Sequence, residues 1–267
     1  MPYIDFKQLV ELEAKCQSTT NIIWRSVAHT DTGHVRKGNE DAFYNDPEQG
    51  LWAVADGMGG LARGDYASSV VVDAFVHYIK ASSIAGCIRD MEIRLREAHA
   101  NCRNSFKGTG KEKRERVGST VAALYSYGGY GFLLWAGDSR VYRLRNDELK
   151  LLTTDHTVAQ DKIASGAMTP QQAARHPSAH VLTRAVGVHQ TLHLDLDFDL
   201  IQAGDRFLVC SDGLYNELCD DELHSLLKEG EAQEAVKSLV KGALDRGGRD
   251  NITAIVVDAV EKSIGAG

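Results

Sequence analysis

Several short apolar runs in this sequence end in an aspartate that stands beside a glycine. The run Leu51–Ala55 is followed by Asp56, Gly57, Met58 and two further glycines. A run of this length and composition predicts a buried β-strand that would place Asp56 at its exposed end. The glycines would let the backbone approach an ion or a ligand without a side chain in the way. A carboxylate beside an accessible carbonyl oxygen suits a hard cation such as Mg²⁺ or Mn²⁺.

The same construction recurs along the chain. The other pieces contribute Glu40 and Asp41 from a polar loop, Asp138, Asp212, and the pair Asp250 and Asn251 before a final apolar run. One such piece is explained by the preference of Asp and Gly for turns, but five pieces beside predicted strands are not. Carboxylates gathered at one sheet edge would repel one another, and a divalent cation would remove that repulsion. We therefore predict one acidic metal site assembled from distant segments.

Six motifs occur in a fixed order from about Trp24 to about Val260. They are Arg36-x-x-Asn39-Glu40-Asp41, Asp56-Gly57-Met58-Gly59-Gly60, Gly118-Ser119-Thr120, Gly137-Asp138-Ser139-Arg140, Ser211-Asp212-Gly213-Leu214 and Asp250-Asn251. As a set they resemble the metal-dependent protein phosphatases of the protein phosphatase 2C family. Within that family the chain resembles compact bacterial single-domain members. It is also similar to the stand-alone phosphatases found with type VI secretion loci.

The resemblance implies a role for each acidic residue in binding two divalent cations, Mn²⁺ or Mg²⁺. Asp56 would bridge both metals and the carbonyl of Gly57 would bind one of them. Asp212 and Asp250 would bind the other, and Asp138 would serve a third, weaker metal together with Asp212.

The remaining implied roles concern water and the substrate. Glu40 and Asp41 would hold metal-bound waters in place. The guanidinium of Arg36 would bind the substrate phosphate, for which a planar two-pronged donor is well suited. A hydroxide bridging the two metals would attack phosphorus directly, so no covalent enzyme intermediate is required.

One position departs from the family pattern. Many members carry a histidine, assigned to protonating the leaving alkoxide, where this chain has Met58. A thioether cannot donate a proton. His29, His34 and His156 lie near the motifs in sequence, but a surface or packing role is favoured for each, so the sequence assigns no general acid.

Hydrophobic patterning predicts an α+β fold. Ten strands and four long helices are expected, with strands in runs and helices in pairs; this arrangement fits two antiparallel sheets covered by helices. The resemblance implies the same four-layer α/β/β/α sandwich, with the metals at one end. We expect a phosphatase domain at residues 21–262, a helical N-terminal extension at residues 1–20, and a flap beside the active site at about 157–190.

The segment 192–200 alternates apolar residues with one histidine and three aspartates, among them Asp195. Such a row could suggest a metal site. Strict alternation is typical of any half-buried strand, so these polar side chains are expected to face solvent.

Composition limits the classes of partner and compartment. The formal net charge of −7 argues against binding to nucleic acid or to an anionic membrane. No apolar run approaches the ~20 residues of a membrane-spanning helix, and no signal peptide is visible. The 5 cysteines form no C-x-x-C pair, which favours reduced thiols and a cytoplasmic location.

We therefore expect a metal-dependent serine/threonine protein phosphatase that acts on phosphorylated proteins, as a monomer. The type VI similarity implies a cognate serine/threonine kinase and its target as partners. A non-catalytic phosphoprotein-binding or sensor relative is an alternative, but Asp56, Asp212 and Asp250 are all retained. A phosphoesterase for small molecules is a third possibility.

Overall fold

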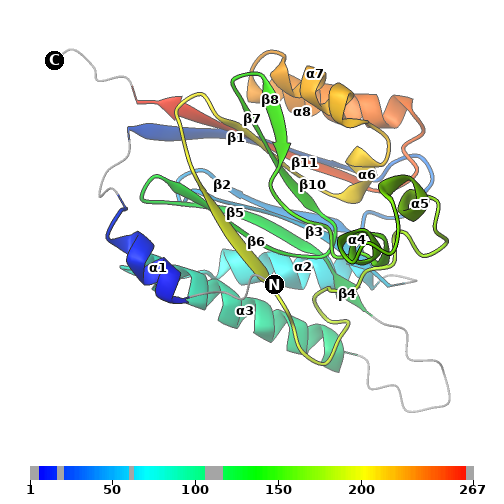
Figure 1. The fold of residues 1–267 in the computed structure, drawn as a ribbon, viewed down its shortest axis with the longest axis horizontal. Helices are drawn as coiled ribbons and strands as arrows, with labels where there is room; N and C mark the ends of the chain where they lie inside the picture. The colour runs from blue at the N-terminus through cyan, green and yellow to red at the C-terminus, as the bar shows by residue number, and fades with distance from the viewer. Residues whose placement is uncertain (1–5, 17–20, 60–62, 106–116, 263–267) are drawn as a thin grey trace.

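Two facing antiparallel sheets form the centre of the structure, a computed structural model that describes residues 6–16, 21–59, 63–105 and 117–262 (Figure 1). All strand pairs in both sheets are antiparallel. The first sheet has the order β1(Ile22–Asp31), β11(Ile252–Glu261), β10(Arg206–Cys210), β7(Arg140–Arg145), β8(Glu148–Leu151). The second has the order β2(Asp41–Asp46), β3(Leu51–Met58), β5(Val121–Tyr127), β6(Tyr130–Ala136), β9(Asp195–Leu200), with the short strand β4(Gly118–Ser119) paired to β3.

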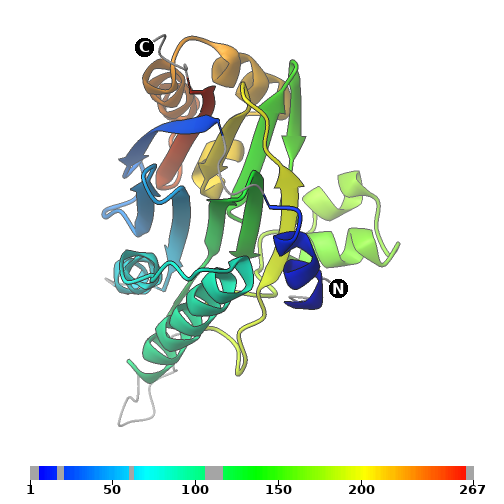
Figure 2. The same cartoon turned by 90° about the vertical axis from the view of Figure 1, so that its left-hand side faces the viewer.

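Helices cover the outer face of each sheet (Figure 2). The second sheet is covered by α2(Gly64–Val76) and α3(Ile84–Asn104), and the first by α7(Asp220–Lys228) and α8(Ala232–Asp245). This is the predicted four-layer α+β sandwich. Within the described residues, no helix combines the length and apolar character needed to cross a membrane.

Strand β10 shows why the central strands read as continuous apolar runs. Phe207 and Val209 pack between the two sheets, whereas Leu208 and Cys210 face the helix layer. Both faces of the strand are therefore buried, and alternation of polar and apolar residues is lost.

Helix α1(Phe6–Glu13) packs on the sandwich. Leu9 and Leu12 are buried, and the carboxylate of Glu13 accepts hydrogen bonds from the Ile84 amide (2.6 Å) and the Tyr127 hydroxyl (2.9 Å). The first of these bonds joins α1 to the first residue of α3. Residues 1–5 and 17–20 of the expected N-terminal extension lie outside the described residues.

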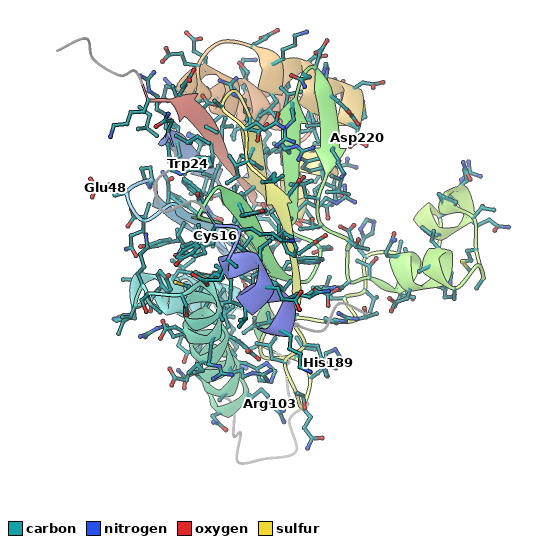
Figure 3. All side chains as sticks on the ribbon, turned by 60° about the vertical axis from the view of Figure 1, so that its left-hand side comes forward. Cys16, Trp24, Glu48, Arg103, His189 and Asp220 are labelled. Atoms are coloured by element: carbon teal, nitrogen blue, oxygen red, sulfur yellow. The ribbon has the colours of Figure 1, made fainter. Side chains whose placement is uncertain are left out.

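The segment predicted as a flap carries two short helices, α4(Val158–Ala164) and α5(Pro170–Ala174), which stand out from the sandwich (Figure 3). Its two ends are tied together at the base. The Val158 amide donates to the Val181 carbonyl (2.9 Å), and the Thr183 amide donates to the His156 carbonyl (2.8 Å). The two ends of the flap are therefore held together, while the helical part projects from the sandwich (Figure 3).

Candidate active site

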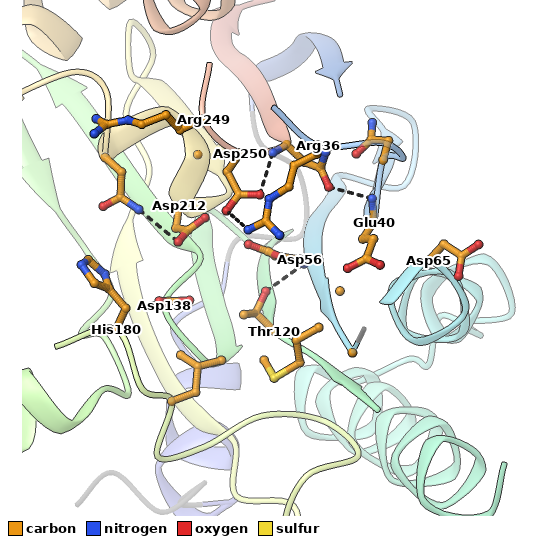
Figure 4. A pocket seen from close by; sticks show the side chains of 18 of the residues that line it. Arg36, Glu40, Asp56, Asp65, Thr120, Asp138, His180, Asp212, Arg249 and Asp250 are labelled. Carbon is orange, nitrogen blue, oxygen red and sulfur yellow. Dashed lines mark hydrogen bonds and ion pairs between the residues drawn. The ribbon is translucent and has the colours of Figure 1, made fainter. Parts of the chain in front are cut away.

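One cavity of about 1230 Å³ collects most of the predicted site residues (Figure 4). It lies at one end of the sandwich, beside the flap. The predicted residues that line it are Arg36, Glu40, Asp56, Gly57, Asp138, Asp212 and Asp250. Asp41 does not line the cavity, and Gly60 of the second motif lies outside the described residues.

Asp56 is fixed by strands on both sides. On one side it pairs with Asp41 of strand β2. On the other side its amide donates to the Thr120 hydroxyl (2.9 Å), and its carbonyl accepts from the Thr120 amide (2.9 Å). The prediction that the strand ends before Asp56 was wrong. Strand β3 continues to Met58 because β4 pairs with it there, so Asp56 is held within a strand.

Gly57 stands where three segments converge. A Cβ atom at this position would lie 2.0 Å from the Gly64 carbonyl oxygen and 2.6 Å from the Glu40 carbonyl oxygen. The Gly57 amide also donates to the Glu40 carbonyl (3.1 Å). Only glycine fits this close approach, which links the polar loop before β2, strand β3 and the start of α2.

Asp250 and Asn251 connect the segment just before β11 to the loop between β1 and β2. Asp250 accepts a hydrogen bond from the half-exposed guanidinium of Arg36 at 2.6 Å. The Asn251 side chain accepts from the Glu40 amide (2.8 Å) and donates to the Thr32 carbonyl (2.8 Å) and the Gly38 carbonyl (3.0 Å). Asn251 thereby holds the loop that carries Arg36 and Glu40 against the cavity.

Asp212 and Asp138 come from the other side of the cavity. Asp212 begins the short helix α6(Asp212–Tyr215), and its Oδ2 accepts from the Asn216 amide group (3.0 Å). Its Oδ1 is buried with no hydrogen-bond partner among the described residues. Asp138 follows β6 and is 6% exposed, and its carbonyl accepts from the Tyr215 hydroxyl (2.9 Å).

Asp41 lies behind the cavity wall. Its Oδ2 accepts from the Ser211 hydroxyl (2.7 Å), which in turn accepts from the Thr253 amide (3.0 Å). Its Oδ1 is a second buried carboxylate oxygen without a partner among the described residues. Asp41 therefore supports the segment just before Asp212 through Ser211.

The pKa values of these carboxyl groups are raised. Burial, followed by repulsion from Asp212, raises the pKa of Asp138 to about 8. Burial raises the pKa of Asp41 to about 7, and burial with the charges of neighbouring aspartates raises that of Asp56 well above its usual range. Burial and Asp250 also raise the pKa of Asp212, and burial raises that of Glu40. The cavity therefore concentrates negative charge that its own cations do not offset.

These residues fit divalent cations. Apart from Arg36, the predicted residues that line the cavity carry oxygen ligands, Gly57 is among them, and Asp212 Oδ1 is buried without a partner among the described residues. In the described part of the chain, no group of three or more His, Cys, Asp or Glu side chains is positioned to hold a metal ion by itself. Mg²⁺ does not require one, because it keeps several waters and binds through one or two carboxylates.

None of the three histidines considered from the sequence lines the cavity. His29 and His34 are exposed elsewhere. His156 is buried and stacks on Trp135, with ring centroids 6.0 Å apart, as expected of a packing histidine. His180, which sequence reasoning did not single out, does line the cavity. Its place in the predicted flap was the only signal that could have pointed to it.

The prediction that the aspartates of the segment 192–200 face solvent was wrong for Asp195. This side chain is buried, accepts a hydrogen bond from Arg184 at 2.6 Å and lies 3.1 Å from the ring nitrogen Nε2 of His156. The strand begins at Asp195, so the side chain faces the base of the flap. Its charge is compensated there by the guanidinium of Arg184.

Comparisons with known proteins agree with this geometry. The family described as Protein phosphatase 2C matches residues 30–245. The serine/threonine protein phosphatase PstP of Mycobacterium tuberculosis is 34% identical over 244 residues, which is 91% of this chain. The chain spans about half, 46%, of the length of that curated relative.

Two solved structures are similar over most of their length. PppA, a key regulatory component of T6SS in Pseudomonas aeruginosa, is 40% identical with a TM-score of 0.80, covering 89% of this chain and 98% of that one. The catalytic domain of PstP in complex with 2 manganese ions is 32% identical with a TM-score of 0.78, covering 90% and 99%.

Proposed function

The chain belongs to the protein phosphatase 2C family, and we propose that it removes phosphate from phosphoserine and phosphothreonine in proteins with the help of two divalent cations. The observation that carries the proposal is the meeting of Asp56, Asp212 and Asp250, from three distant segments, in one cavity. Loss of such aspartates is expected in a non-catalytic relative, and all three are retained here.

The residues of the cavity divide into two groups of oxygen donors. In our proposal Asp56 serves both cations, the Gly57 carbonyl serves one, and Asp212 and Asp250 serve the other. Asp138, with Asp212, would hold a third and weaker cation. When bound, Mn²⁺ or Mg²⁺ would lower the pKa of a water so that it attacks phosphorus as hydroxide, and would offset the charge of the phosphate.

Arg36 is the proposed phosphate-binding residue. Its guanidinium is 53% exposed and is held at the cavity by Asp250. Its two-pronged set of N–H donors at the cavity edge suits a phosphate dianion. The hydrogen bonds of the Asn251 side chain to the Thr32 and Gly38 carbonyls fix the loop that carries Arg36. Glu40 lines the same wall and, with Asp41 behind it, would keep water molecules oriented.

The proposed substrates are phosphorylated proteins. The likeness to PppA supports a role in controlling type VI secretion, in which the chain would oppose a cognate serine/threonine kinase by dephosphorylating its target. We propose that residues 21–262 form the phosphatase domain and that the flap at about 157–190 influences which proteins are accepted.

The test is phosphate release by the purified full-length chain from a phosphothreonine peptide and from small phosphate monoesters. With Mn²⁺ we expect turnover of the peptide, and with excess chelator we expect none. Equal turnover in chelator would overturn the metal proposal. Turnover of small monoesters without any turnover of phosphopeptides would instead assign the site to a small-molecule phosphoesterase.

A further inference from the structure

Hydrolysis of a phosphothreonine ester releases an alkoxide, which is a strong base. The P–O bond breaks far more readily when the leaving oxygen receives a proton in the transition state, and such proton transfer contributes about 10²–10⁴-fold to rates. Met58 lines the cavity at the position after Gly57, but a thioether has no proton to give. The cavity must therefore obtain this proton from another group.

His180 is the histidine that lines the cavity. It lies on the side of Asp138 and Asp212, across the cavity from Glu40 and Asp65 (Figure 4). The His180 ring forms no hydrogen bond to any described residue, so both ring nitrogens are open to a ligand.

The backbone around His180 is anchored although the side chain is exposed. The Ala179 amide donates to the His176 carbonyl (2.9 Å), and the Val181 amide donates to the Ser178 carbonyl (3.2 Å). The Val181 carbonyl accepts from the Val158 amide (2.9 Å) at the base of the flap. His180 is thus placed by the tied base of the flap, and its ring can reach solvent for reprotonation.

We infer that His180 donates the proton to the leaving oxygen, a role that rests on the proposed phosphatase function. A water that has lost one proton to solvent bonds to phosphorus through its oxygen, as hydroxide, while the bond from phosphorus to the alkoxide oxygen breaks. The proton of an imidazolium nitrogen passes to that oxygen, which leaves as an alcohol. The neutral imidazole of His180 then takes a proton from solvent, so atoms and charge balance.

The test compares His180→Gln with the unchanged chain on a series of substituted phenyl phosphates and on a phosphothreonine peptide, all with Mn²⁺. Substituted phenyl phosphates of similar size vary the basicity of the leaving group while the rest of the substrate stays the same. We expect His180→Gln to lower kcat on the peptide about 100-fold. We expect it to change kcat on p-nitrophenyl phosphate less than about twofold, because that leaving group needs little protonation.

The dependence of kcat/KM on leaving-group basicity should therefore be steeper for His180→Gln than for the unchanged chain. His29→Gln, an exposed histidine on β1, is the matched control and should follow the unchanged chain. Parallel dependences in His180→Gln and the unchanged chain would overturn the inference, as would a change confined to KM for the peptide. Absence of turnover by the unchanged chain with any substrate would refute the proposed function instead.

Discussion

Buried carboxylates are held in opposite ways in two regions of this molecule. At the base of the flap, Asp195 is 7% exposed and bonds to Arg184 and His156. Although burial alone would raise it, these partners lower the pKa of Asp195. In the candidate active site Asp138 is buried to the same degree, yet burial and the neighbouring Asp212 raise its pKa to about 8.

This difference in charge compensation distinguishes a structural carboxylate from a carboxylate whose charge remains uncompensated in the folded protein. Removing a carboxylate from water is costly, and a fold normally offsets the cost with a cation and hydrogen bonds. At Asp195 the protein supplies both. Within the described part of the chain Asp56, Asp138 and Asp212 form no ion pair, and in our proposal a cation bound in the cavity would offset the free energy of these charges.

The largest effect should follow from Asp56→Asn. We expect phosphatase activity with Mn²⁺ to fall by more than about 1000-fold, beyond the 10–100-fold typical of residues that only support metal ligands. Unfolding in chelator should show increased stability, because one of several aspartates that repel one another is removed. Asp197→Asn, on the exposed part of β9, is the control and should change neither quantity. Activity near that of the unchanged chain would show that the site is misplaced.

Asp195→Ala should give the opposite result for stability. Removing one partner of a buried ion pair leaves Arg184 without its carboxylate, and we expect the free energy of unfolding to drop by about 3 kcal/mol. Urea unfolding monitored by tryptophan fluorescence measures this. Asp197→Ala should stay within about 0.5 kcal/mol. Equal stability of both variants would mean that the two regions do not differ as described.

The pH dependence of stability should separate chelated from cation-bound protein. The folded pKa values of Asp41 and Asp138, about 7 and about 8, lie above those of unfolded aspartate, so the folded state binds more protons between about pH 4 and those values. In chelator, stability should therefore fall as pH rises through this window, by about 1.4 kcal/mol per pH unit for each group. Saturating Mn²⁺ should reverse much of the loss at pH 8. A flat profile in chelator would indicate that these carboxyl groups are already compensated.

The smallest effect should come from Arg36→Ala, which removes one exposed cation beside the acidic cavity. We expect KM for a phosphothreonine peptide to rise about tenfold with a smaller change in kcat, since the lost contact binds substrate and transition state alike. Steady-state kinetics with Mn²⁺ tests this. Arg36→Lys should restore charge but not the two-pronged contact, and so should recover only part of the affinity. An unchanged KM would remove Arg36 from contact with phosphate.

Much of the fold was predictable because it rests on local patterns. The strands at 130–136, 140–145 and 206–210 were placed to the residue by their apolar runs. Boundaries set by distant partners were not. Helix α3 begins at Ile84 rather than at 88, because the Ser83 side chain accepts from the Gly86 amide and Glu13 accepts from the Ile84 amide.

The sequence by itself determined which residue types could form the site, because aspartates beside glycines follow apolar runs that are typical of buried strands. It could not determine which buried aspartates are compensated. Asp56 and Asp195 each sit in a strand-forming segment, and only the packing of segments far apart in the chain supplies Asp195 with Arg184 and His156 and leaves Asp56 among other aspartates. Coulomb interactions depend on distance in space, so tertiary structure alone decided where negative charge accumulates and which histidine, His180, reaches it.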